Sequence, residues 1–125
     1  MRRDETQMNH NLKFAVLRYV PNLFSDLSIA FGVLGYEVGT GTFADAKFLQ
    51  VWEPVLRLDP GADIEALDAL RNEIQNEWSD AQERAILLKM FLNTFSNCVQ
   101  VQEGSCHASD PKTEMEGLAV RYLGA

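Results

Sequence analysis

The stretch Lys13–Val38, KFAVLRYVPNLFSDLSIAFGVLGYEV, is the densest apolar run in this 125-residue chain and decides its fold. From Lys13 to Val20, apolar and β-branched residues alternate between two faces, which predicts a β-strand. Pro21 ends that strand because proline has no amide hydrogen for the ladder. Alternation resumes and predicts a second strand from about Leu27 to Val38, so later elements have a two-stranded scaffold to cover.

The GTGT turn at 39–42 leads into a third expected strand, about Ala46–Trp52. The turn lacks the Gly-Lys-Ser/Thr of a phosphate-binding loop, so we expect a hairpin connection and no nucleotide cofactor. Asp63 then has the position of an N-cap for a helix with one apolar stripe. The stripe comprises Ile64, Leu67, Leu70, Ile74 and Trp78.

A second helix is expected at about Asp80–Phe95, with Ser79 and Gln82 resembling a capping box. Its stripe would comprise Ala81, Ala85, Leu88, Leu92 and Phe95, with Ile86, Leu87 and Met90 lying off it. Such a helix is either buried inside the domain or presents a partner surface.

Alternation at Cys98–Gln102 predicts a fourth, polar-faced strand, followed by a loop at Gly104–Ser109. Asp110 and Pro111 then begin a last helix that ends at Gly124, with Met115, Leu118, Ala119 and Tyr122 as its buried stripe. The order β-β-β-α-α-β-α predicts a single two-layer α+β domain, an antiparallel sheet of about four strands with helices packed on it.

Composition is that of an ordered globular domain, with 46% hydrophobic and 23% charged residues. Residues 1–12 carry mixed charges without an apolar core, so we expect a flexible tail there and one domain over 13–125. No apolar run reaches the ~20 residues of a membrane span. We therefore expect a cytoplasmic protein that does not contact a membrane.

Two cysteines, Cys98 and Cys106, lie eight positions apart without CxxC spacing, and reduced thiols are expected. Cys98 is interpreted as a buried apolar residue at a strand start and Cys106 as a loop thiol. A catalytic or zinc site built from both cysteines with His107 and Asp110 is an alternative, but its spacing matches no standard zinc module. Asp110 is better explained as a helix cap, so no metal is expected.

The net charge of -7 is concentrated in one segment. The segment 59–83 contains one base, Arg71, and eight acids: Asp59, Asp63, Glu65, Asp68, Glu73, Glu77, Asp80 and Glu83. The remainder of the chain is balanced and has no basic stripe, which argues against direct nucleic-acid binding. The acidic run is either a solvated helix face or an electrostatic docking surface for a basic partner.

Arg18 shares a strand face with apolar residues, so its guanidinium either snorkels to the sheet edge or is buried beside an acid such as Asp26 or Glu53. An anion-binding arginine is the functional alternative. Trp52 is interpreted as a core residue or as the border of a pocket.

The motifs FAVLRYVPN (14–22), SIAFGVL (28–34) and VQVQEGSCHASDP (99–111) resemble the family called domain of unknown function 3037, over Phe14–Leu123. The resemblance matches an Arg-Tyr-x-Pro element at Arg18, Tyr19 and Pro21 and a Gly-Val pair at 32–33. It leads us to expect an acid and an amide where this chain has Leu27 and Ala30. The family implies no established activity; its members are small bacterial proteins, sometimes encoded near HipA-like kinases.

We expect a non-enzymatic interaction or regulatory domain that binds another protein, such as a HipA-like kinase or a basic partner. The expected contact residues are Glu65, Asp68 and Glu73 of the acidic helix together with Ile86 and Met90, which also offer a surface for a homodimer. One alternative is a small hydrolase or ligand-binding protein with a cleft formed by Arg18, Tyr19, Cys106 and His107. A second alternative is an acidic mimic of nucleic acid.

Overall fold

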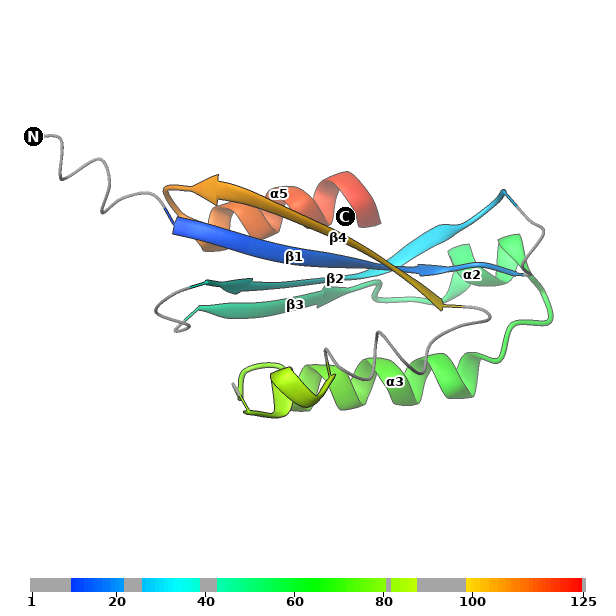
Figure 1. Ribbon diagram of the computed structural model, residues 1–125. Coiled ribbons are helices and arrows are strands. Elements are labelled where there is room, and N and C mark those ends of the chain that lie inside the picture. The colour runs from blue at the N-terminus through cyan, green and yellow to red at the C-terminus, as the bar shows by residue number, and fades with distance from the viewer. Residues whose placement is uncertain (1–9, 22–25, 39–42, 81, 88–98, 125) are drawn as a thin grey trace, which may run out of the picture.

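The protein, seen in a computed structural model, is built on a four-stranded antiparallel sheet with strand order β3-β2-β1-β4 (Figure 1). The structure describes residues 10–21, 26–38, 43–80, 82–87 and 99–124. The strands are β1 His10–Tyr19, β2 Ile29–Glu37, β3 Ala44–Phe48 and β4 Val99–Ala108; the helices are α2 Glu53–Leu58, α3 Ile64–Glu77 and α5 Pro111–Leu123. The α+β class and the expected order of strands and helices are confirmed, with α2 as an addition.

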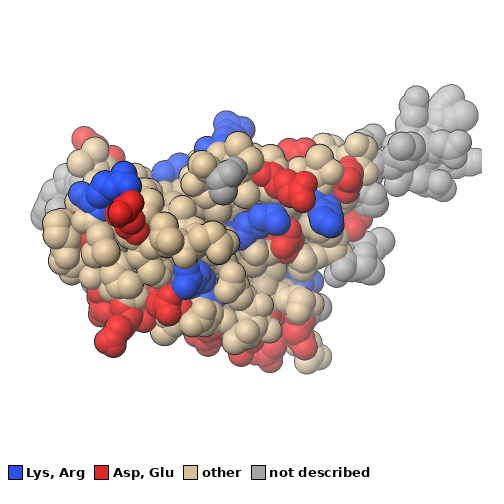
Figure 2. Space-filling view, turned by 180° about the vertical axis from the view of Figure 1, so that it is seen from behind, with Lys and Arg blue, Asp and Glu red and all other residues tan. Residues whose placement is uncertain are grey.

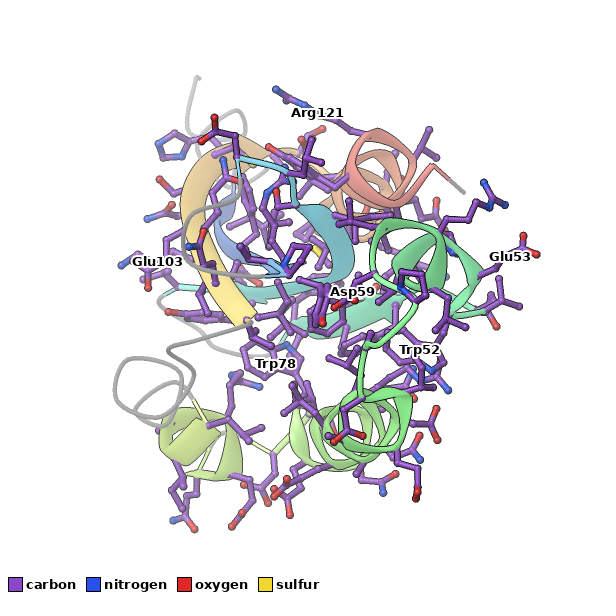
Figure 3. All side chains as sticks on the ribbon, turned by 90° about the vertical axis from the view of Figure 1, so that its right-hand side faces the viewer. Trp52, Glu53, Asp59, Trp78, Glu103 and Arg121 are labelled. Carbon is purple, nitrogen blue, oxygen red and sulfur yellow. The ribbon has the colours of Figure 1, made fainter. Side chains whose placement is uncertain are left out.

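Helices cover both faces of the sheet, so the domain has three layers where two were expected (Figures 1 and 3). The reason is the alternation in β1, which places apolar side chains on both faces. Leu17 and Tyr19 face α3 and belong to a core with Leu67 and Ile74. Leu12 faces α5 and belongs to a second core with Val33, Met115 and Leu118.

β1 begins three residues earlier than expected, at His10, and all ten of its residues pair with β4. Leu12, which the sequence assigned to the tail, is fully buried beneath α5. The register with β2 shifts between Leu17 and Arg18, so Phe31 has no partner in β1. This bulge adds Phe31 to the α3-side core, where its ring packs 5.8 Å from that of Trp52.

β4 extends to Ala108, so the loop expected at Gly104–Ser109 is strand except for its last residue. Glycine interrupts the local strand pattern, but Gly104 pairs with Phe14 of β1. The Phe14 ring fills the place where a side chain at position 104 would lie. The contact with Phe14, which is distant in sequence, therefore stabilises a strand that the local sequence does not favour.

The two longest helices begin and end largely as expected. The Asp63 carboxylate accepts from the Ala66 amide at the start of α3, and Leu67, Ile74 and Trp78 are buried. At the start of α5 the Asp110 carboxylate accepts a hydrogen bond from the Thr113 hydroxyl. This bond is the main reason why the pKa of Asp110 is lowered. The caps and stripes are therefore set by local sequence, as their spacing predicted.

β3 and the segment after it differ from expectation. The strand expected at Ala46–Trp52 ends at Phe48, and Glu53 begins the short helix α2, in which Pro54 occupies the first turn. Proline is favoured there because its missing amide hydrogen would have no helical partner. Trp52 precedes this helix and packs against the α3-side core.

Residues 82–87 are helical, but the residue that caps this helix and the side of it that is buried differ from those expected. Asp80, and not Ser79, supplies the cap, accepting from the Gln82 and Glu83 amides. In this described part Leu87 and Arg84 are buried, whereas Ala85 of the expected stripe is exposed. The Arg84 guanidinium is accommodated by aromatic rings, which a count of apolar positions does not anticipate.

None of the helices described here is long and apolar enough to cross a membrane. Residues 1–9, Cys98 and Met90, and with them the expected tail and part of the expected second helix, lie outside the described residues.

Candidate functional site

The acidic segment separates into two groups according to what each carboxylate contacts. The four aspartates have internal partners: Asp59 accepts from the Tyr19 hydroxyl at 2.6 Å, Asp63 and Asp80 cap helices, and Asp68 binds Trp52 and Arg71. The four glutamates, Glu65, Glu73, Glu77 and Glu83, make no side-chain hydrogen bond or ion pair within the described ranges. Figure 2 shows carboxylate groups gathered along the side of the molecule where α3 lies.

We call Glu65, Glu73 and Glu77 the glutamate face of α3. Glu65 and Glu73 are exposed, Glu77 is half-buried, and the three extend over about 18 Å of helix at 1.5 Å per residue. The opposite side of the same helix is fixed to the sheet by Leu67, Ile74 and Trp78. The carboxylates are therefore presented by a helix whose position is set by the core.

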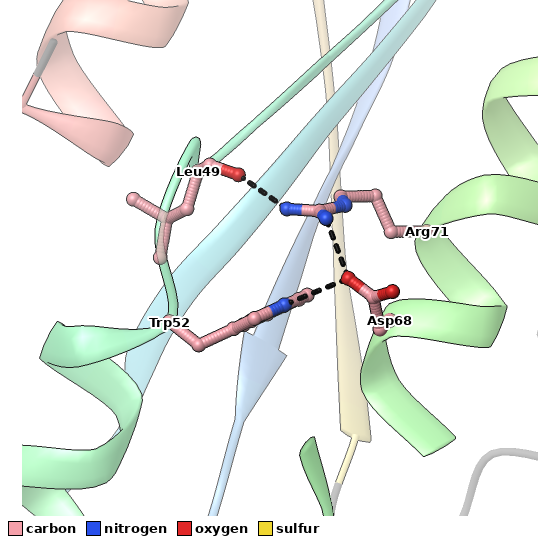
Figure 4. Close-up of polar contacts among 4 residues, drawn as sticks. All are labelled: Leu49, Trp52, Asp68 and Arg71. Carbon is pink, nitrogen blue, oxygen red and sulfur yellow. Dashed lines mark hydrogen bonds and ion pairs between the residues drawn. The ribbon is translucent and has the colours of Figure 1, made fainter. Parts of the chain in front are cut away.

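Asp68 belongs to a polar network at the other flank of α3 (Figure 4). Its Oδ1 accepts from Trp52 Nε1 at 3.0 Å and from Arg71 Nη2 at 2.5 Å. Arg71 also donates to the Leu49 carbonyl at 2.9 Å and lies 4.9 Å from the centre of the Trp52 ring. The network joins α3 to the segment between β3 and α2, so Asp68 is engaged in holding the fold.

Arg18 has neutral partners where an acid was expected. Its guanidinium donates to Gln102 Oε1 at 3.0 Å and to Ser28 Oγ at 3.4 Å, and it lies 5.9 Å from the centre of the Tyr122 ring. No ion pair of Arg18 with Asp26 or Glu53 is present among the described side chains; Glu53 pairs with Arg57 at 2.6 Å. Ala30 lies directly opposite Arg18 in β2, so the polar side chain that the family resemblance led us to expect would have adjoined it.

The cleft expected from Arg18, Tyr19, Cys106 and His107 is not formed. Arg18 pairs with Gln100, whereas His107 pairs with Asn11, and these positions of β1 are about 24 Å apart at 3.4 Å per residue. Arg18 and His107 also project from opposite faces of the sheet. His107 shares the face of its partner Asn11, and Asn11 and Arg18 are an odd number of residues apart along β1. Alternation along one strand cannot bring these side chains together.

Cys106 is a strand residue packed against α5, in surroundings that disfavour its thiolate. Burial raises the pKa of Cys106, and the nearby Glu114 carboxylate raises it further through its charge and a hydrogen bond. A nucleophilic thiol needs a lowered pKa, so this environment opposes catalysis by Cys106. Among the described residues no group of three His, Cys, Asp or Glu side chains is placed to hold a metal.

A cleft of about 290 Å³ lies on the α3-side face of the sheet, beside Trp78 at the end of α3. Its polar lining comes from Lys13, Glu103 and Ser105, and its aromatic lining from Tyr36 and Trp78. This volume is near the lower end for small-molecule pockets. Ser105 has no hydrogen bond to an acid or base in the described chain, so the cleft suits binding better than nucleophilic catalysis.

Arg84 supports the aromatic wall of this cleft. It donates to the Trp78 carbonyl at 2.8 Å, and its guanidinium lies 5.6 Å from the Tyr36 ring centre and 5.9 Å from that of Trp78. Trp78 Nε1 donates to the Gly35 carbonyl at 2.9 Å. In the sequence, the signal available for this role is an arginine that interrupts an apolar run.

Fold and side chains define a small α+β domain with a modest mixed cleft and a glutamate face that has no partner among the described residues. The chain belongs to the family described as Protein of unknown function (DUF3037), whose model matches residues 14–121. No curated protein and no solved structure matches the chain. The family resemblance drawn from the short motifs is thereby confirmed.

Proposed function

We propose that this protein is a non-enzymatic interaction domain that binds a basic partner protein through the glutamate face of α3. The observation that carries the proposal is that Glu65, Glu73 and Glu77 have no partner in the described chain although their helix is anchored to the core. Because the core already fixes the backbone of this helix, binding has to order only the glutamate side chains, and their field steers a cationic surface toward them.

Ile86 supplies an apolar contact beyond the end of α3. Its side chain is 53% exposed, whereas its neighbour Leu87 is buried. An exposed apolar side chain beside a charged rim is typical of protein interfaces. The binding surface therefore comprises the glutamate face and Ile86; Asp68, engaged with Arg71, is not part of it.

The test compares two doubly substituted proteins of equal net charge. Glu65→Lys with Glu73→Lys alters the glutamate face, and Glu53→Lys with Glu116→Lys alters exposed positions in α2 and α5. Each protein is immobilised and used to capture partners from a bacterial lysate at low salt, with mass spectrometry as readout. A purified HipA-like kinase is one candidate partner to include.

We expect partners captured by the native protein to be lost with the α3 variant and retained with the control. Capture should also fall at about 1 M salt, where the Debye length is about 3 Å. If both variants capture the same proteins as the native chain, the glutamate face is not the binding surface. If the captured partner is a nucleic-acid-binding protein displaced by DNA or RNA, the face acts as a mimic of nucleic acid.

A second candidate function is small-molecule binding in the cleft beside Trp78. Lys13 and Glu103 offer opposite charges, and Tyr36 and Trp78 offer ring surfaces, which together suit a zwitterionic or aromatic ligand. Quenching of tryptophan fluorescence by such ligands, lost in Glu103→Gln or Lys13→Met, would support this function. Thermal melting unchanged across a library of such compounds would argue against it.

A further inference from the structure

β3 forms one of the two outer edges of the sheet, and the backbone groups on its outer side have no partner strand among the described residues. Within the described residues β3 pairs only with β2. The bonds from Glu37 N to Phe43 O and from Leu49 N to Phe31 O show which residues of this segment direct their backbone groups toward β2. In an antiparallel pair, the backbone amide and carbonyl groups of alternate residues point toward the partner strand. The residues whose backbone groups point toward β2 are therefore Phe43, Asp45, Lys47 and Leu49. Ala44, Ala46 and Phe48 therefore direct their amide and carbonyl groups away from the sheet.

Space is available along this edge. Two hollows of about 350 and 310 Å³ flank it; both are lined by Ala46 and by Gln75 of α3. Ala119 and Leu123 of α5 close the first hollow. The described chain places no other strand on β3, and the alanine side chains leave the edge accessible.

We infer that a second copy of this chain pairs with β3 in antiparallel fashion, with the twofold axis at Ala46, so that the two sheets join into one of eight strands. In this register Ala44 lies opposite Phe48 of the other copy and Ala46 opposite itself. All outward-facing groups of one edge then meet outward-facing groups of the other. A twofold axis gives each copy the same contacts, as closed dimers require.

Charge selects this register over its neighbours. Asp45 and Lys47 share the α5-side face and are 3.5 Å apart within one chain. With the axis at Ala46, Asp45 lies directly opposite Lys47 of the second copy, and two ion pairs form across the axis. With the axis at Asp45 or at Lys47, like charges would be opposed, which is unfavourable in an antiparallel pair.

The edge is self-complementary in hydrogen-bonding groups and in charge, and this favours a second copy over an unrelated peptide. Pairing through β3 is also a different contact from self-association through Ile86, because Ile86 lies in the segment 82–87 and is not part of β3. The two dimers are distinguished by which substitutions abolish them.

The experiment measures mass by light scattering during size exclusion, with the full chain, from about 1 to 100 μM. Asp45→Lys and Lys47→Asp should each weaken the dimer by about tenfold or more, because two cross-axis ion pairs become two like-charge contacts. The chain carrying both substitutions should dimerise as the native chain does, since its charges are exchanged but still opposed.

Mixing the two single variants provides the sharpest comparison. Each has like charges at 45 and 47, and the within-chain pair is lost in both, yet one variant is complementary to the other across the axis. The mixture should form a heterodimer that neither variant forms as a homodimer. Restored stability of the single chain cannot explain that result.

Ala46→Pro tests the backbone independently of charge. Proline removes the outward amide hydrogen at the axis and leaves the bonds to β2 in place, so thermal melting should show a folded protein that is monomeric. A native protein that is monomeric at about 100 μM overturns the inference. So does a dimer that persists in all the edge variants but is lost in Ile86→Asp, and so does a mixture that remains monomeric.

Discussion

Asp68 is the acidic residue of α3 whose loss should weaken the fold, in contrast to the glutamates beside it. Substituting alanine removes the acceptor for Trp52 Nε1 and for the Arg71 guanidinium. The Arg71 side chain keeps its bond to the Leu49 carbonyl and its contact with the Trp52 ring, so the network is damaged without being abolished.

The expected magnitude follows from these contacts. The hydrogen bond from Trp52 contributes about 1 kcal/mol. The ion pair with Arg71 adds about 1 kcal/mol at most, because the Asp68 side chain is 43% exposed and its charge is partly screened. Alanine recovers about 0.5 kcal/mol of helix propensity. Asp68→Ala should therefore lower the free energy of unfolding by about 1.5 kcal/mol, or the melting temperature by about 6 °C.

Urea denaturation followed by circular dichroism measures this change. Glu73→Ala is the matched control, since it removes a carboxylate from the exposed side of the same helix and should alter stability by no more than about 0.5 kcal/mol. In a Trp52→Phe background, which lacks the indole donor, Asp68→Ala should cost about 1 kcal/mol less. Equal losses for Asp68→Ala and Glu73→Ala, or full additivity with Trp52→Phe, would refute the reasoning.

Three further predictions concern α5 and the face of the sheet that it covers. Gly35→Ala should destabilise the fold by about 1–3 kcal/mol in urea denaturation, because a side chain there would overlap the buried sulfur of Met115. Gly117→Ala, which meets nothing within 4 Å, should stabilise α5 by up to about 1 kcal/mol. Alkylation of Cys106, followed against pH with the other cysteine replaced, should show a pKa above that of a free thiol. Glu114→Gln should shift that profile to lower pH, because it removes the negative charge that disfavours the thiolate; an unshifted profile would contradict the assigned cause.

Periodicity predicted the elements whose stability is local. The stripe ending at Trp78 and the caps Asp63 and Asp110 depend on residues within a few positions of one another, and the structure confirms them. Predictions failed where a contact with a residue distant in sequence outweighs the local preference. Gly104 lies within a strand because the ring of Phe14 covers it, and that contact spans 90 positions.

The candidate site shows the same division more strongly. The sequence showed where negative charge is concentrated, but Asp68 and Glu73 were indistinguishable as outward positions of one helix. Contact with Trp52 and Arg71 removes Asp68 from the surface available to a partner. The expected grouping of Arg18 with His107 was wrong because the pairing of β1 with β4 places them at opposite ends and on opposite faces.

By itself the sequence determined the order of the strands and the longer helices, the acidic segment and the family, because these depend on spacing and composition along the chain. Only the tertiary structure decided the strand order, the second helical layer and which carboxylates have no partner among the described residues. Those outcomes depend on contacts between residues far apart in the sequence. The strand order, which leaves β3 at an edge among the described strands with Asp45 and Lys47 on one of its faces, is one such outcome.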